Sequence, residues 1–248
     1  MPWFFVNVVI GILPWRPMHP SLHRFYHPLL NDQAQQLMEG PEVHHMTKVM
    51  RLKAGEELML LDGRGKLAHV RIEELRKEQC TYTLMQMFQG DDPMSGLHIA
   101  MAPTKQVDRM EWFLEKAVEM GIGRFTPLST ERGERERLRL DRLERIAVSA
   151  MKQSLRTHMP ILDELTEINE LLDAAGPENK FIAHCYEGEK QAQIIPAAPC
   201  IILIGPEGDF SLEEVALAKE KGFKALSLGA ARLRTETAAM KAVALYNG

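Results

Sequence analysis

The sequence predicts an α/β protein with two domains, a small β-barrel followed by a mainly parallel sheet with helices on both faces. In residues 57–88, apolar and polar side chains alternate, which is typical of half-buried antiparallel strands. From residue 97 onward, short apolar runs alternate with helical patterns, which is typical of a parallel sheet. A chain of 248 residues is long enough for two medium-sized domains.

The barrel is expected over residues 18–90. Its strands are predicted at 57–62, 67–73 and 80–88, with a turn at Gly63-Arg64-Gly65. Small barrels of this kind often bind RNA through loops at the rim. Gln89–Gly96, which contains Gly90 and Pro93, is the natural linker to the second domain.

The second domain is expected over residues 96–248. Strands are predicted at 97–102, 125–128, 161–165, 181–184, 201–204 and 225–228, and helices at 108–120, 138–155 and 237–246. No GxGxxG opens a helix after a strand and no Walker A sequence is present. The usual dinucleotide-binding and P-loop sites are therefore excluded.

Two strand ends in this domain lead through glycine-containing loops into helices. Residues 201–204 run into Gly205-Pro206-Glu207-Gly208, and residues 225–228 run into Gly229 and an Arg-Thr-Glu-Thr segment. Ligands bind at the carboxyl ends of strands in open α/β sheets. Ser211 with Glu214 has the spacing of a capping box, so a helix should begin near Leu212. A tight turn with no ligand explains one such loop equally well.

The two loops together resemble the signature pair of the RsmE family, which belongs to the SPOUT class of methyltransferases. The matching segments are Gly205–Gly208, Leu228-Gly229 and Leu233–Ala238. The resemblance implies methylation of uridine N3 in 16S ribosomal RNA of the small subunit, with S-adenosylmethionine as the methyl donor. It also implies a trefoil-knotted C-terminal domain, a PUA-like N-terminal barrel and a homodimer. The general rarity of knotted chains would argue against the knot.

The resemblance covers residues 18–248, and the chain departs from the family pattern at three places. Further matching residues are Arg24, His45, Arg51, Lys105, Glu111, Lys116, Glu119, Arg132, Gln153, Ser154, Arg156 and Pro160. Asp209 stands where the family usually has a second glycine, and it is tolerated if it adopts the left-handed conformation. Ala231-Arg232 replaces a polar or basic residue followed by isoleucine. The third departure is the N-terminal extension.

Residues 1–17 form an apolar extension, uncharged through Trp15. The run is shorter than the about 20 apolar residues of a transmembrane helix, and Arg16 follows the apolar stretch instead of preceding it as in a signal peptide. An upstream start codon, with Met18 as the functional start, is the preferred interpretation. The alternative is an extension that packs on the body or on a partner.

Composition indicates a globular cytoplasmic protein without a membrane or metal requirement. Hydrophobic residues make up 45% and charged residues 26%. The three cysteines have no CxxC spacing, which favours buried free thiols over disulfides or a zinc site. The net charge of -4 does not indicate nucleic-acid binding, so any RNA contact must come from local basic groups. The arginines between residues 132 and 145 fit a solvated helix, except Arg132, which precedes it.

These arguments select three groups of site residues. We expect the cofactor to contact Ile204, Gly205, Pro206, Glu207, Gly208, Leu228, Gly229, Leu233, Arg234, Thr235 and Thr237, chiefly through the backbone. The catalytic candidates are Arg234, Arg132 and Glu236, and the RNA-binding candidates are Arg24, His45 and Arg51.

Methyl transfer to uridine N3 requires alignment of the reactants and loss of the N3 proton. Arg234 can stabilise the anion but cannot remove a proton at neutral pH. Glu236 fits equally well as a first-turn residue favoured by the helix dipole, and the sequence identifies no base. Two alternatives stay open: another SPOUT RNA methyltransferase, acting on the ribose 2′-oxygen or another base, and a non-catalytic RNA-binding ribosome assembly factor.

Overall fold

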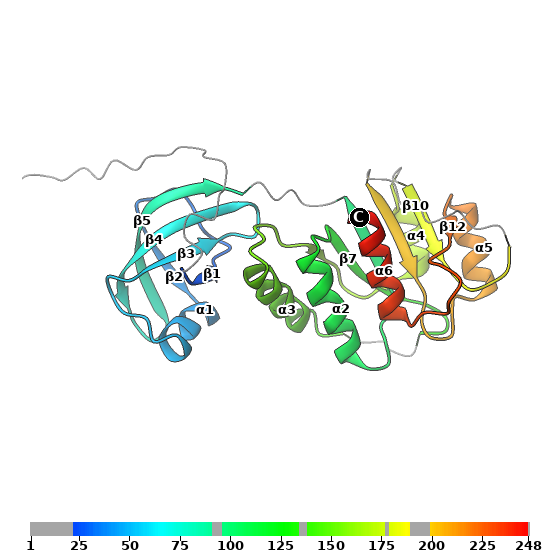
Figure 1. Ribbon diagram of the computed structural model, residues 1–248, viewed down its shortest axis with the longest axis horizontal. Coiled ribbons are helices and arrows are strands. Elements are labelled where there is room, and N and C mark those ends of the chain that lie inside the picture. Colours follow the sequence, from blue (N-terminus) through cyan, green and yellow to red (C-terminus); the bar gives the residue numbers. More distant parts are fainter. Residues whose placement is uncertain (1–21, 91–95, 134–137, 177–178, 189–198, 248) are drawn as a thin grey trace, which may run out of the picture. The chain divides into compact units, whose positions relative to one another are not determined.

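The computed structural model describes residues 22–90, 96–133, 138–176, 179–188 and 199–247 (Figure 1). The chain divides near Pro93 into two compact units, and Leu155–His158 belongs to the first of them. The predicted apolar extension at residues 1–17 and most of the predicted linker lie outside the described residues.

The first unit contains a five-stranded sheet in the order β1-β3-β4-β5-β2. The strands are β1 (Arg24–Tyr26), β2 (Gln35–Glu39), β3 (Glu57–Leu61), β4 (Lys66–Leu75) and β5 (Gln79–Gln89). Neighbouring strands are antiparallel except β1, which runs parallel to β3. The predicted strands between residues 57 and 88 are thus confirmed, whereas the short strands β1 and β2 were not predicted.

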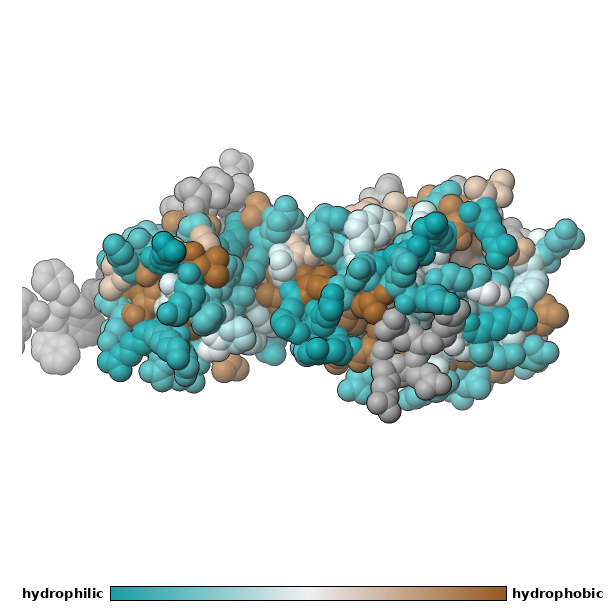
Figure 2. Space-filling view, turned by 90° about the horizontal axis from the view of Figure 1, so that it is seen from below, coloured by the Kyte–Doolittle hydropathy of each residue, from teal (hydrophilic) through white to brown (hydrophobic). Residues whose placement is uncertain are grey.

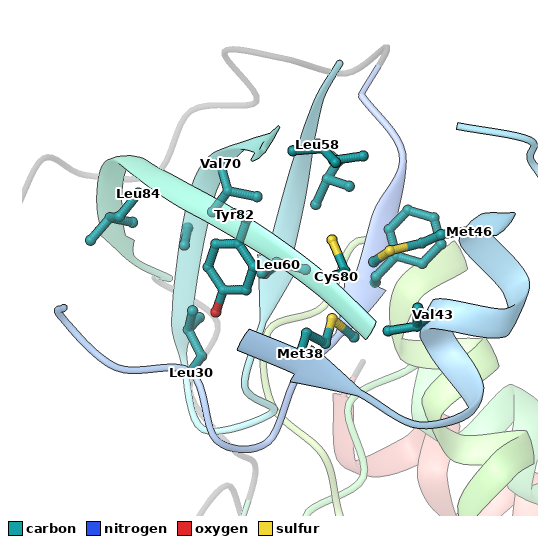
Figure 3. Close-up of a cluster of buried hydrophobic side chains, with 13 residues drawn as sticks. Leu30, Met38, Val43, Met46, Leu58, Leu60, Val70, Cys80, Tyr82 and Leu84 are labelled. Atoms are coloured by element: carbon teal, nitrogen blue, oxygen red, sulfur yellow. The ribbon is translucent and has the colours of Figure 1, made fainter. Parts of the chain in front are cut away.

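The core of the first unit lies between this sheet and a short helical segment. The segment consists of α1 (Pro41–His44) and the π-helix η1 (His45–Val49). Figure 3 shows Val43 and Met46 of this segment extending toward Met38 and Cys80 of the strands. Tyr82 is fully buried, and its hydroxyl donates to Gln36 Oε1 at 2.9 Å. The only hydroxyl in this cluster is therefore satisfied, as burial requires.

Leu155–His158 joins the first unit through close backbone contacts. The Gly65 N–H donates to the Thr157 carbonyl at 3.1 Å, and Thr157 is buried. A Cβ added at Gly65, where φ is +101°, would lie 2.8 Å from the His158 ring. A Cβ added at Gly90 would collide with the Thr157 side chain. Glycine is therefore favoured at position 65 by its positive φ and at position 90 by the close approach of the returning segment.

The second unit is built on a seven-stranded sheet in which every recorded strand pair is parallel. The order is β12-β10-β11-β6-β7-β8, with β9 also pairing with β7. The strands are β6 (Leu97–Met101), β7 (Arg124–Ser129), β8 (Ile161–Leu162), β9 (Thr166–Glu167), β10 (Asn179–Ala183), β11 (Cys200–Ile204) and β12 (Lys224–Leu226). The predicted parallel sheet is confirmed.

Helices cover both faces of this sheet (Figure 1). They are α2 (Val107–Glu119), α3 (Leu140–Gln153), α4 (Ile168–Ala174), α5 (Leu212–Glu220) and α6 (Thr235–Asn247). Helix α2 packs against α3 and α6, and α6 returns to the middle strands β6 and β11. The apolar sides of α4 and α5 share one buried cluster with residues of β6, β7, β10 and β11. Helix α4 was not predicted, and α6 begins two residues earlier than expected.

The described surface is largely polar. Figure 2 shows one face on which hydrophilic residues predominate and hydrophobic residues form smaller patches. None of the helices among the described residues is long and apolar enough to cross a membrane. Cys80 and Cys200 are buried free thiols, and burial raises their pKa to about 11 and about 12 respectively. The expectation of burial is wrong for Cys185, which is exposed because it follows β10 in a loop.

Candidate active site

The two glycine-containing loops are joined directly. Thr235, the first residue of α6, donates its hydroxyl hydrogen to the carbonyl oxygen of Gly205 at 3.0 Å. Gly205 follows β11, and the second loop follows β12. Since β11 and β12 are both parallel to β10, their carboxyl ends lie at the same edge of the sheet. The predicted pairing of these loops at one strand edge is therefore present in the fold.

The first loop is a tight turn with an exposed tip. The N–H of Asp209 donates to the Pro206 carbonyl at 3.0 Å, which places Glu207 and Gly208 at the two central positions. Both residues are exposed, whereas Gly205 and Pro206 are buried. Within the described residues, nothing accepts a hydrogen bond from the N–H of Glu207 or Gly208. The tip thus offers two backbone donors to a ligand.

The two glycines of this loop serve different purposes. A Cβ added at Gly205 would lie 3.0 Å from the Phe210 ring, so a side chain there would press on this buried ring. A Cβ added at Gly208 would meet only the side chain of Arg132, at an ordinary 3.5 Å. Gly208 also lies outside the positive-φ region. The chain's own packing therefore does not itself require glycine at position 208, whereas close approach of a ligand to this backbone would.

Asp209, where the family pattern has glycine, adopts the left-handed conformation with φ 64°. This outcome confirms the condition under which the departure is tolerated. Its carboxylate is engaged on both oxygens: Oδ1 accepts from the N–H of Phe210 at 2.9 Å and Oδ2 from the N–H of Cys185 at 2.8 Å. The substitution therefore ties the turn to the loop that follows β10.

Arg132, one of the catalytic candidates, lies at this turn and is bound to the protein itself. Its Nη1 donates to the Tyr186 hydroxyl and to the Gly208 carbonyl, both at 3.1 Å, and approaches the Phe210 carbonyl at 3.5 Å. The hydrogen bond with Tyr186 raises the pKa of the Arg132 guanidinium. Arg132 is exposed and carries a full positive charge beside the loop.

The predicted capping box is present and extends further than expected. Ser211 Oγ accepts from the Glu214 N–H at 3.2 Å, and Glu214 Oε2 accepts from the Ser211 N–H at 2.7 Å. Glu214 Oε1 also accepts from the N–H of Glu131 at 2.8 Å, although the two residues are far apart in sequence. One buried carboxylate therefore fixes the start of α5 and the loop after β7.

The charged side chains of the second loop are exposed to solvent. Gly229 adopts φ 108°, which favours glycine, and its N–H donates to Ser227 Oγ at 3.3 Å. Leu228 is buried, whereas Arg232 and Arg234 are exposed. Leu233 is half-buried and Thr237 is exposed. Arg234 is thus exposed to solvent immediately before α6, and it directly precedes Thr235, whose hydroxyl is bonded to Gly205.

Glu236 is placed differently from Arg234. It lies in the first turn of α6 and is 8% exposed. Its Oε1 is 3.8 Å from Arg109 Nε of α2, and Oε2 is buried without a hydrogen-bond partner among the described residues. This position favours the interpretation of Glu236 as a first-turn residue, held toward α2. Arg109 was not predicted, because no local pattern pairs a helix residue with one so distant in sequence.

The RNA-binding candidates all lie in the first unit. Arg24 opens β1 and is half-buried, and burial lowers the pKa of its guanidinium. His45 opens η1, with its ring edge-on to Phe25 at a centroid distance of 5.7 Å. Arg51 is exposed just beyond η1, with φ 55°. Among the described residues, no group of three or more His, Cys, Asp or Glu side chains could hold a metal ion.

Comparison with known proteins identifies both units. An RNA methyltransferase domain family matches residues 91–247, and an RNA methyltransferase PUA domain family matches residues 39–84. Ribosomal RNA small subunit methyltransferase E of Aquifex aeolicus is 30% identical over 230 residues, covering 90% of this chain and 98% of the relative. The counterpart from Rickettsia conorii is 29% identical, covering 84% of this chain and 87% of the relative.

Solved structures agree with these matches. A probable rRNA-methyltransferase from Porphyromonas gingivalis superposes with a TM-score of 0.78 at 37% identity, covering 90% of this chain and 96% of the other. A ribosomal RNA small subunit methyltransferase E from Neisseria gonorrhoeae, solved bound to S-adenosyl methionine, has a TM-score of 0.77 at 30% identity with the same coverage. The chain belongs to the ribosomal RNA small subunit methyltransferase E family of RNA methyltransferases.

Proposed function

We propose that this protein methylates N3 of a uridine in 16S ribosomal RNA, with S-adenosylmethionine as the methyl donor. The observation that carries the proposal is the buried Thr235–Gly205 hydrogen bond. It joins the two signature loops at the carboxyl edge of a parallel sheet, where ligands of open α/β proteins bind. Membership of the methyltransferase E family supports the choice of substrate.

The residues of the two loops fit S-adenosylmethionine. The free N–H groups of Glu207 and Gly208 suit a ligand that is held through the backbone, and the missing side chain at Gly208 lets such a ligand approach closely. We assign its contacts to Ile204, Gly205, Pro206, Glu207, Gly208, Leu228, Gly229, Leu233, Arg234, Thr235 and Thr237. When bound, the cofactor supplies a methyl group that is already activated by its sulfonium. The protein then has to orient the uridine and stabilise the charge that develops on it.

Arg234 is the proposed source of that stabilisation. Its side chain is exposed, it is the last residue of the second loop before α6, and its guanidinium is always charged. An arginine near uridine N3 favours the deprotonated form of the base without itself taking the proton. Arg132 and Glu236 are proposed as further members of the site. Their contacts with Gly208 and Arg109 favour supporting roles over direct contact with the reacting atoms.

The first unit is the proposed RNA-binding module. Arg51 is exposed, Arg24 is half-buried, and the His45 ring lies edge-on to the buried Phe25 ring. Basic groups of this kind contact phosphates, which position an RNA without reading its sequence. The proposed partner is ribosomal RNA or the small ribosomal subunit, and the proposed location is the cytoplasm.

A homodimer is also proposed. The inward side of α6 (Ala239, Ala242 and Val243) is buried within its own unit. Trp112 on helix α2, which packs against α6, is nevertheless 47% exposed, which leaves a large aromatic side chain for a second copy to cover. Light scattering at micromolar concentration should give the dimer mass, and Trp112→Glu should shift it toward the monomer. A monomeric wild-type protein contradicts this proposal.

The trefoil knot of the family is inferred for this chain as well. Helix α6 packs against β6 and β11, the middle strands of the sheet. The knot itself is a prediction of the family relationship.

The test of the proposed function is methylation of 16S ribosomal RNA by the purified protein. Nuclease digestion and mass spectrometry should identify 3-methyluridine as the product, both with naked RNA and with small subunits compared in parallel. A ribose 2′-O-methyl product or another methylated base supports a different RNA methyltransferase. Binding of RNA without binding of S-adenosylmethionine supports the non-catalytic assembly factor.

A further inference from the structure

Tyr186 forms hydrogen bonds with two other strand-end loops, the one after β11 and the one after β7. The proposed function assigns no role to Tyr186. It lies in the loop after β10, and its ring packs, partly buried, against the apolar cluster of α4 and α5. Its hydroxyl donates to the Phe210 carbonyl at 2.7 Å and accepts from Arg132 Nη1 at 3.1 Å. The donor and an acceptor site of this hydroxyl are thus both used in holding the loops together.

The preceding residue makes a second connection to the same turn. The N–H of Cys185 donates to Asp209 Oδ2 at 2.8 Å. Two consecutive residues after β10 therefore contact two consecutive residues after β11, Asp209 and Phe210. Arg132 completes the set from the loop after β7 by donating to the Gly208 carbonyl. Three strand-end loops converge on residues 208–210.

These contacts fix one peptide plane at both ends. The Gly208 carbonyl is held by Arg132, and the Asp209 N–H on the other side of the same peptide bond is held by the Pro206 carbonyl. Because the peptide is planar, its orientation is set by the two bonds together. That plane closes the turn whose tip presents the N–H groups of Glu207 and Gly208. A turn held in its bound shape loses less conformational entropy when a ligand binds.

We propose that Tyr186 and Asp209 are positioning residues that hold the Pro206–Asp209 turn in the orientation needed to bind S-adenosylmethionine. This inference rests on the proposed function. Neither side chain has to touch the cofactor. Tyr186 acts through Arg132 and the Phe210 carbonyl, and Asp209 acts through its left-handed backbone and the bond to Cys185.

Other contacts keep the turn folded when the Tyr186 hydroxyl or the Asp209 carboxylate is removed. The effect of these two groups on cofactor binding can therefore be measured separately from their effect on stability. Phe210 is fully buried, and the Ser211–Glu214 capping box holds the start of α5. In Tyr186→Phe the ring stays available for packing and only the hydroxyl is lost. In Asp209→Gly the positive φ is retained without strain while both carboxylate bonds are lost.

The experiment measures cofactor affinity by calorimetry, melting temperature, and KM and kcat for methylation, all on the full chain. Tyr186→Phe and Asp209→Gly each remove two hydrogen bonds that hold the turn, and each should weaken S-adenosylmethionine binding about three- to tenfold. KM for the cofactor should rise by the same factor, while kcat at saturating cofactor and the melting temperature stay close to wild type. Tyr246→Phe, which removes a hydroxyl at the far end of α6, is the matched control and should bind as wild type.

Three outcomes separate the hypotheses. If wild type binds no S-adenosylmethionine, the proposed function fails and this inference fails with it. If wild type binds but both variants bind equally well, only the positioning role is overturned. If the variants lose affinity in step with a fall of several degrees in melting temperature, the contacts are structural and the inference is again overturned.

Discussion

The hydroxyl of Thr235 donates a hydrogen bond to the carbonyl oxygen of Gly205 at 3.0 Å, and both residues are buried. The bond joins two loops between which the chain forms α5 and β12. Since the proposed cofactor contacts belong to both loops, this bond helps to fix their relative placement, in addition to the pairing of β11 and β12 with β10.

Thr235→Val should therefore weaken both the fold and the ligand site. Valine has nearly the same shape but leaves the buried Gly205 carbonyl without its partner, which costs about 1–3 kcal/mol of unfolding free energy. Affinity for S-adenosylmethionine should fall as well. Urea unfolding and calorimetry measure the two effects. Thr235→Ser retains the hydroxyl and should recover most of both, whereas a Thr235→Val protein as stable as wild type would show that the bond contributes nothing.

Features that depend on neighbouring residues could be predicted from the sequence. The capping box of Ser211 and Glu214, the strands of the barrel hairpin and the apolar side of α2 all follow from local spacing. The left-handed conformation of Asp209 follows from its place in a glycine position of the turn. Each of these signals is contained within a few residues of the feature that it predicts.

Features that join distant segments could not be predicted in this way. The order of the strands alone brings together three pairs of residues that are distant in sequence. These pairs are Glu131 with Glu214, Arg132 with Tyr186, and Glu236 with Arg109. The return of Leu155–His158 to the first unit has the same origin. Strand β1 and helix α4 are too short to give a clear periodic pattern, and β2 has mostly polar side chains. Tyr186 could have been selected by its place after a strand end, since that rule had already selected the two glycine loops.

The two glycines of the first loop should respond differently to substitution. Gly208→Val should leave the melting temperature close to wild type, because an added Cβ meets only Arg132 at 3.5 Å. It should reduce S-adenosylmethionine affinity by more than about tenfold, which corresponds to about 1.4 kcal/mol, because the added branches enter the space assigned to the ligand. Unchanged affinity in a folded Gly208→Val protein contradicts the assignment of the cofactor to this loop.

Gly205→Ala is the companion variant and should act on stability. Its Cβ would lie 3.0 Å from the Phe210 ring, so that the buried ring has to move. The expected loss is about 1–3 kcal/mol of unfolding free energy, measured by urea unfolding. A Gly205→Ala protein with wild-type stability would show that the ring adjusts without strain.

RNA binding should depend on Arg51 without involving the cofactor. Arg51 is exposed, so Arg51→Ala removes a positive charge with little change in packing. If the side chain contacts a phosphate, the slope of log affinity against log salt should flatten by about one unit. Arg24→Ala is a less direct test because Arg24 is half-buried, and its effect on melting temperature has to be measured alongside. An unchanged salt slope in Arg51→Ala would remove that residue from the proposed interface.

Arg234→Ala should reduce methyl transfer far more than RNA or cofactor binding. The side chain is exposed, so its loss should leave the melting temperature unchanged. If its cation stabilises the uridine anion only in the transition state, kcat should fall by about 10²–10³-fold, as for other preorganised charge-stabilising groups. Arg232→Ala removes the same charge two residues earlier and serves as the control.

A competing role for Arg234 is to hold the loop in place, in which case cofactor affinity and melting temperature fall together. Turnover, calorimetry and thermal unfolding on one preparation of each variant decide between the two roles.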